Sequence, residues 1–290
     1  MNIHFVNTFD VSPFLGGTER ITDTLCREFR KRCLCRCYLA YYEGIDSLYK
    51  KTVFDGRLCL GSRKNVALLI DYIVKKDIDV VLLQGQLGLA KGIRQAIGKK
   101  IKIIFAHHLY PGVEREDVSW SNSVLKCWKS RGLMANMLRL TAYPILKVKH
   151  LYALPLKYKD TYDYSDKVVL LSSELIQPFT AFGHIKDTDK FSVIPNTLSF
   201  DIFFPFEKIY EKEKVVLIVS RLVENPKRIS LALRSWKELM SDDRLADWKL
   251  VIVGSGSDEN NYKSYVAEND IKNIYCLLYT SPSPRDRSVS

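Results

Sequence analysis

Two fixed cations follow an apolar run late in the sequence. In "VSRLVENPKR", Val219 to Arg228, Arg221 and Lys227 lie six residues apart, directly after the run "KVVLI". A turn needs only small polar residues, whereas a forked guanidinium and a point-charge ammonium together suit the oxygens of a diphosphate. A diphosphate that leaves a sugar gains negative charge, which fixed cations stabilise. The pattern suits a diphosphate site, and a pair of solvated surface cations is an equal alternative.

Two glycine pairs lie close to expected helix starts. Gly16 and Gly17 in "FLGGTERITD" precede a helix whose free N–H groups suit a phosphate or carboxylate, and Glu19 is favourable in its first turn. In "WKLVIVGSGSDENN", Gly254 and Gly256 follow an apolar strand, but the third glycine of a dinucleotide fingerprint is missing. We expect both pairs to line a ligand cleft through their backbones. For the first pair, an ordinary turn is the alternative.

Polar side chains also follow other expected strands. His108 in "FAHHLYPG" comes after His107, the more strand-like of the two, and can donate to a sugar hydroxyl or phosphate or carry a proton. Ser172 follows "DKVVLL" before a short helix that Ser173 could cap, and Asn196 follows a proline in "VIPN". A structural role is the alternative for His108. For Ser172 and Asn196, local capping or turn formation is the alternative.

The elements expected around these residues alternate between strands and helices. Helical periodicity is found in "RKNVALLIDYIVKK", with apolar residues Val66, Leu69, Ile70, Ile73 and Val74, and in "RISLALRSWKELM", with Ile229, Ala232, Leu233, Trp236 and Met240. Continuous apolar runs predict parallel strands covered on both faces, at Ile3–Val6, Cys37–Tyr42, Ile78–Leu83, Ile101–Ala106, Lys167–Leu171, Phe191–Ile194, Val215–Val219 and Lys249–Val253. This order predicts an α/β fold with doubly wound parallel sheets.

A charged segment with a proline, Asn196 to Lys214, separates two series of strands and helices. We predict an N-terminal domain at residues 1–200 with six strands. A second domain at 201–275 would have two strands and the start of a third at Asn273–Tyr275. Because two or three strands and their helices cannot bury a domain-sized core, we expect the second domain to be incomplete.

The charge and composition restrict the class of protein. Of 290 residues, 47% are hydrophobic and 27% charged, as in a soluble globular protein, and no apolar run is long enough for a membrane helix. We see no secretion signal, and the seven cysteines lack paired zinc-site spacing, so reduced thiols in the cytoplasm are expected.

The net charge of +11 includes a basic segment from Ser121 to Lys159, which has eight Lys or Arg residues and no Asp or Glu. Aromatic and aliphatic residues lie between the cations. Such a segment suits an anionic membrane surface, at the inner face of the plasma membrane, or an acidic acceptor. Without a nucleic-acid-binding motif, nucleic acid is not an expected partner. A pair of solvated helices with incidental lysines is the alternative.

The order of the motifs resembles glycosyltransferase family four. The resemblance rests on Gly-Gly-x-Glu-Arg at Gly16–Arg20, the strand-end His108, "SDKVVLLS", "IPN" at Ile194–Asn196, the Arg221/Lys227 pair and "WKLVIVGSG", and it covers residues 1–275. It implies a GT-B fold of two Rossmann-like domains. It also implies retaining, metal-independent transfer of a sugar from a nucleotide-diphosphate donor to a growing glycan of the lipopolysaccharide, capsule or exopolysaccharide type.

By this resemblance, Arg221 and Lys227 hold the donor diphosphate, Gly16–Gly17 closes over donor and acceptor, and His108 contacts the transferred sugar as the catalytic-site histidine. The sequence departs from the family at Ser220 and Arg228, where glycines are usual. The family's paired glutamates would lie beyond Tyr275, so the chain as given is expected to be inactive or nearly so.

The last fifteen residues are "CLLYTSPSPRDRSVS". The first eleven resemble the conceptual translation of a sequencing-library adaptor, so we expect residues 276–290 to be a non-native tail. A natural Ser/Pro-rich tail is the alternative. For the function, a sugar-nucleotide epimerase of the same fold, a non-catalytic sugar- or nucleotide-binding module, and a basic membrane- or nucleic-acid-associated protein are the alternatives.

Overall fold

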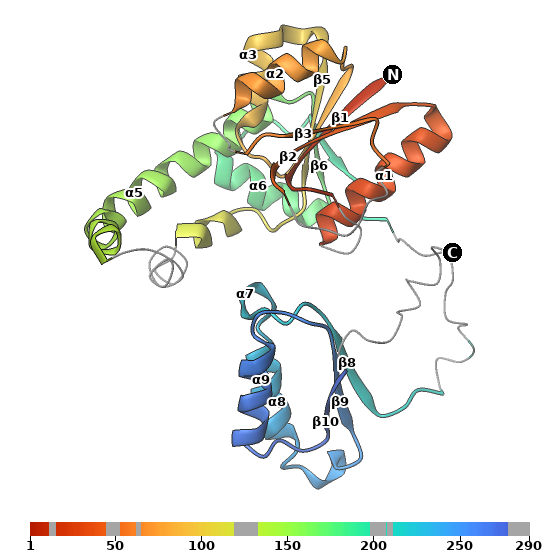
Figure 1. Ribbon diagram of the computed structural model, residues 1–290, viewed down its shortest axis with the longest axis vertical. Helices are drawn as coiled ribbons and strands as arrows, with labels where there is room; N and C mark the ends of the chain where they lie inside the picture. Colours follow the sequence, from red (N-terminus) through yellow and green to blue (C-terminus); the bar gives the residue numbers. More distant parts are fainter. Residues whose placement is uncertain are drawn as a thin grey trace. The chain divides into compact units, whose positions relative to one another are not determined.

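The computed structural model describes residues 1–11, 16–44, 53–61, 65–118, 133–197, 207 and 211–277. The chain divides into two compact units, Met1–Ser199 and Phe200–Ser290 (Figure 1). Each unit contains one parallel β-sheet with helices packed on it, so the predicted α/β class is confirmed.

The first unit has a seven-stranded sheet in the order β3-β2-β1-β4-β5-β6-β7, and every neighbouring pair is parallel. Six of these strands were predicted, and the seventh, β3, was missed. It has four residues, "GRLC", at the sheet edge, so it has no apolar run to find. The strands are β1 (Asn2–Phe9), β2 (Arg36–Glu43), β3 (Gly56–Cys59), β4 (Val80–Gln84), β5 (Lys102–His107), β6 (Lys167–Leu170) and β7 (Phe191–Val193).

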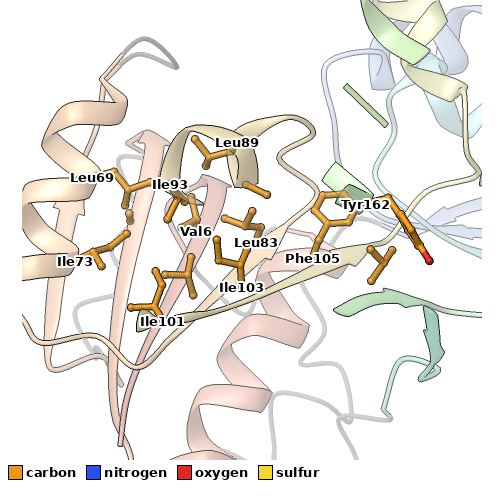
Figure 2. Close-up of a cluster of buried hydrophobic side chains, with 14 of the residues drawn as sticks. Val6, Leu69, Ile73, Leu83, Leu89, Ile93, Ile101, Ile103, Phe105 and Tyr162 are labelled. Carbon is orange, nitrogen blue, oxygen red and sulfur yellow. The ribbon is translucent and has the colours of Figure 1, made fainter. Parts of the chain in front are cut away.

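Helices cover both faces of this sheet. Helix α1 packs against one face, where its Cys26 meets Phe5 and Leu39. Helices α2, α3, α5 and α6 contribute to the core on the other face (Figure 2). The helices are α1 (Gly17–Cys33), α2 (Val66–Lys75), α3 (Leu89–Ile97), α5 (Leu133–Tyr164) and α6 (Ile176–Gly183), with short 3-10 turns η1 (Gly98–Lys100), η2 (Val113–Val118) and η4 (Ser173–Leu175). This arrangement is the predicted doubly wound one.

Helix α5 extends away from the sheet at its N-terminal end (Figure 1). It has 32 residues and contains Pro144 and Pro155. The C-terminal part packs on the core through the buried residues Leu154, Tyr158 and Tyr162. The described part of the basic segment, 133–159, therefore lies in one helix, and the rest of the segment, 121–132, lies outside the described residues. Lys126 and Lys129 lie outside the described residues.

The second unit has a three-stranded parallel sheet in the order β10-β9-β8. Its helices α8 and α9 lie on the same face, where Leu233, Trp236 and Tyr262 enclose Leu250 and Ile252 (Figure 1). The elements are β8 (Val215–Val219), α7 (Glu224–Lys227), α8 (Ile229–Leu239), η6 (Asp243–Leu245), β9 (Lys249–Val253), α9 (Glu259–Glu268) and β10 (Ile274–Leu277).

Strand β10 continues through Cys276 and Leu277, two residues of the expected non-native tail. The remaining tail residues, 278–290, lie outside the described residues, so the origin of the tail stays a prediction. Among the described helices, none is both long and apolar enough to cross a bilayer.

Candidate functional site

The carboxyl edge of the first sheet carries the predicted polar residues of this unit. Because all seven strands are parallel, the residues that follow β5, β6 and β7 lie at the same edge. These include His108, Ser172 and Asn196. This edge is where open α/β sheets bind their ligands.

His108 makes a short contact with a neighbouring strand. Its Nε2 lies 2.5 Å from Oε1 of Gln84, the last residue of β4, which is only 4% exposed. Burial lowers the pKa of His108, and a hydrogen bond with the Asn196 side chain opposes this shift. The structure thus brings His108, Asn196 and Gln84 together. Gln84 was not among the predicted site residues, although it ends the apolar run "VVLLQ" just as the histidines end theirs.

His107 is the last residue of β5, one residue beyond the predicted strand, and its side chain is packed in the core. It is 2% exposed and its ring lies among Phe105, Tyr158 and Phe179. Burial, with a smaller effect from His108, lowers the pKa of His107 to about 4. The neighbouring Tyr158 hydroxyl donates to Oε2 of Glu114 at 2.7 Å, which ties the segment after β5 to α5. His107 is therefore a structural residue.

Gly16 and Gly17 mark the beginning of α1. Gly16 is the N-cap residue, and a Cβ there would lie 2.3 Å from Oε2 of Glu19. The Glu19 side chain is mostly buried and folds back over the helix start, so a carboxylate of the chain itself lies at the positive helix end. At Gly17, no described atom lies within 4 Å of where a Cβ would be.

Ser172 has a local role in the structure. Its Oγ accepts a hydrogen bond of 3.3 Å from the Glu174 backbone N–H, which makes it the N-cap of η4. The expectation that Ser173 caps this helix is wrong, because β6 ends one residue earlier than predicted and η4 already begins at Ser173. The alternative of local capping therefore holds for Ser172.

In the second unit, Arg221 and Lys227 lie on the connection from β8 to α8, where both are exposed. Within the described part of the chain, neither side chain makes a hydrogen bond or ion pair. Their loop is held by Glu224, whose carboxylate accepts from the Ser230 hydroxyl at 2.6 Å and from the Tyr262 hydroxyl at 3.0 Å. These bonds, led by that from Ser230, lower the pKa of Glu224. The loop is thus fixed while its two cations remain free to meet an anion.

Gly254 and Gly256 let two loops pack backbone against backbone. A Cβ at Gly254 would lie 1.8 Å from the Ser220 carbonyl oxygen, and one at Gly256 would lie 2.3 Å from that of Leu222. The Leu222 N–H donates to the Ser255 carbonyl at 2.9 Å. The group that approaches these glycines is therefore the backbone of the Arg221 loop, which gives the glycines a structural role beside the predicted contact with a nucleotide.

No group of three or more His, Cys, Asp or Glu side chains suited to a metal ion occurs within the described ranges.

One protein-family model, described as glycosyl transferases group 1, matches residues 199–285. This range includes Arg221, Lys227 and both glycines of the second unit. Among curated protein sequences, none matches the chain.

Several solved structures have a similar fold. WaaG, a glycosyltransferase involved in lipopolysaccharide biosynthesis, is 13% identical with a TM-score of 0.57, over 95% of this chain and 70% of WaaG. Sucrose-phosphate synthase from Thermosynechococcus elongatus is 12% identical with a TM-score of 0.60, over 95% of this chain and 70% of that protein.

A third similar structure is S. aureus TarM, as a mutant in complex with fondaparinux, alpha-GlcNAc-glycerol and UDP. It is 16% identical with a TM-score of 0.41, over 74% of this chain and 37% of TarM. The chain thus spans little more than a third of TarM and 70% of each of the other two proteins.

Proposed function

We propose nucleotide-sugar-dependent glycosyl transfer for this protein, which carries a glycosyl transferases group 1 domain at residues 199–285 on a GT-B-type fold. The sugar would leave a nucleotide diphosphate and join a growing glycan with retention of configuration. One observation carries the proposal: Arg221 and Lys227 are exposed on a loop that Glu224, Gly254 and Gly256 hold in place.

The chemistry follows from charge. When the bond between sugar and diphosphate breaks, the leaving oxygens gain negative charge, and two fixed cations stabilise it more than they stabilise the intact donor. The leaving phosphate can then accept the proton of the acceptor hydroxyl on the same face of the sugar. In this scheme Arg221 and Lys227 bind the diphosphate, His108 contacts the sugar, and no side chain acts as a nucleophile.

Binding of nucleoside diphosphates tests the two cations without requiring turnover. Calorimetry with UDP, GDP and ADP should identify a preferred nucleotide. Arg221→Ala and Lys227→Ala should each weaken its binding at least about tenfold, because a charge-assisted hydrogen bond contributes about 1.5–3 kcal/mol.

Two other cations of the same unit provide the controls. Lys249 is the first residue of β9, and Arg244 lies in η6 just before it, so both are near the amino edge of the sheet rather than the carboxyl edge. Lys249→Ala and Arg244→Ala should leave the affinity unchanged. If all four variants bind like the parent, the diphosphate role is wrong. A non-catalytic binding module would instead bind the nucleotide normally and transfer no sugar from any donor.

We place the acceptor at a membrane surface, as a glycan on a lipid carrier or lipid A core. Five exposed apolar side chains of α5 lie within an arc of about 100° at the helical spacing of 100° per residue. They are Met137, Ile145, Val148, Tyr152 and Leu156. Lys149 borders this apolar stripe, and Lys147 is exposed on the same turn. Apolar residues with neighbouring lysines suit the interface of an anionic bilayer.

Flotation with anionic vesicles tests this surface. The double variants Lys147→Gln/Lys149→Gln and Ile145→Ser/Tyr152→Ser should each reduce the fraction of protein that floats, because each removes one of the two contributions to binding. Leu146→Ser is the matched control, since Leu146 is 51% exposed but lies outside the stripe. Equal flotation of all variants would remove the membrane role.

A further inference from the structure

The contact between Gln84 and His108 restricts where the imidazole can carry its proton. An amide oxygen only accepts hydrogen bonds, so the contact of Nε2 with Oε1 of Gln84, at 2.5 Å, favours the tautomer with the proton on Nε2. The Gln84 backbone is itself held, because Nε2 of Gln86 donates to the Gln84 carbonyl at 2.9 Å. Gln84 is also paired in the sheet, opposite Ala106 of β5.

The other imidazole nitrogen is left as an acceptor. Nδ1 of His108 is buried and has no hydrogen-bond partner of ordinary geometry among the described residues, and the Asn196 side chain is the nearby polar group that influences the ring's pKa. A neutral imidazole with its proton on Nε2 has a lone pair on Nδ1. Burial favours this neutral form, since it lowers the pKa of the ring against the opposing effect of Asn196.

We propose that Gln84 is a positioning residue that holds His108 in the Nε2–H tautomer, so that Nδ1 accepts a hydrogen bond from a hydroxyl of the ligand. A neutral ring in this tautomer cannot donate from Nδ1 to a phosphate oxygen. The geometry therefore selects the hydroxyl from the two partners, sugar hydroxyl and phosphate, that a histidine at this position could have. Assigning the hydroxyl to the transferred sugar rests on the proposed function, whereas the tautomer does not.

Nitrogen-15 NMR of the imidazoles tests the tautomer in the full chain without any ligand. The signal of His108 is assigned by its loss in His108→Asn. At neutral pH, His108 should show a protonated Nε2 and an unprotonated Nδ1. Gln84→Met removes the accepting oxygen with little change of volume, so the His108 signals should move toward a mixture of tautomers. Gln84→Glu places a carboxylate at the same position, so the titration midpoint of His108 should move to higher pH.

Gln95→Met is the matched control, because it makes the same substitution at an exposed glutamine of α3. It should leave the tautomer of His108 as in the parent. A protonated Nδ1 in the parent, or an unchanged tautomer in a folded Gln84→Met together with an unmoved midpoint in Gln84→Glu, overturns the proposal. The tautomer can be as expected while Arg221→Ala and Lys227→Ala bind diphosphates normally. In that case the proposal of glycosyl transfer is wrong, whereas the proposal that Gln84 positions His108 stands.

Discussion

Single residues explain how the Arg221 loop departs from the family pattern. Arg228 follows Lys227 at a position where glycines are usual, and the structure gives it φ 49° and ψ 44°, a left-handed conformation. Such a conformation costs a residue with a Cβ roughly 1–2 kcal/mol, whereas glycine adopts it freely. Arg228, in place of the usual glycine, is therefore a point of local backbone strain next to Lys227.

Replacing this arginine should stabilise the second unit. Arg228→Gly is expected to raise the free energy of unfolding by about 0.5–1 kcal/mol, because relief of the strain exceeds the added entropy of the unfolded chain. The measurement is denaturant unfolding followed by the fluorescence of Trp236, a buried residue of this unit. Arg228→Ala keeps the Cβ and should give no gain. Equal stability of the two variants would show that the conformation is not strained.

At the scale of elements, the sequence predicted most strands but not their side-chain contacts. The bounds of β8 and β9 were predicted as observed, because continuous apolar runs between polar turns are strong signals. Helix α2 shows the limit of such patterns. Val74 lies on the predicted apolar face but is 66% exposed, since α2 packs through Leu69 and Ile73 and Val74 lies about 100° further round the helix from Ile73.

The site was predicted less completely, for a physical reason. Gln84 and His108 are 24 residues apart in the sequence and meet because β4 and β5 pair in register. The position of the Glu19 carboxylate next to Gly16 likewise depends on the side-chain rotamer rather than on the residue type. A sequence pattern places residues at a sheet edge, but which of them touch depends on register and rotamer.

The two loops at the carboxyl edge of the second sheet act as one element. Gly256→Ala should lower the free energy of unfolding of this unit by about 1–3 kcal/mol, because the new Cβ would meet the Leu222 backbone, which cannot move without breaking the loop. Its neighbour offers the control. Ser255 is exposed and bonds through its backbone, so Ser255→Ala should leave the stability unchanged. If Gly256→Ala leaves the free energy of unfolding unchanged, the two loops do not pack this closely.

For the whole molecule, the distribution of histidines separates the two units. All five histidines lie in Met1–Ser199, and Phe200–Ser290 has none. Burial lowers the pKa of His4 to about 3 and that of His107 to about 4. Between the folded values and the unfolded value of about 6.5, the unfolded chain binds protons that the folded chain does not. The contribution of these histidines to the free energy of unfolding of the first unit is therefore fully present above this window and decreases as the pH falls through it.

This linkage predicts a different pH response for each unit. Hydrogen exchange between pH 7 and 5, corrected for intrinsic rates, should show weaker protection of β1, β4 and β5 at low pH. The loss should be roughly 1 kcal/mol per pH unit for each buried histidine. Protection of β8 and β9 should not change in this range. His4→Leu should remove part of the slope, because both ring nitrogens of His4 are buried without a partner among the described residues. His184→Asn, at an exposed position, should not. Parallel loss of protection in both units would mean that they unfold together rather than as the two separate units of the fold.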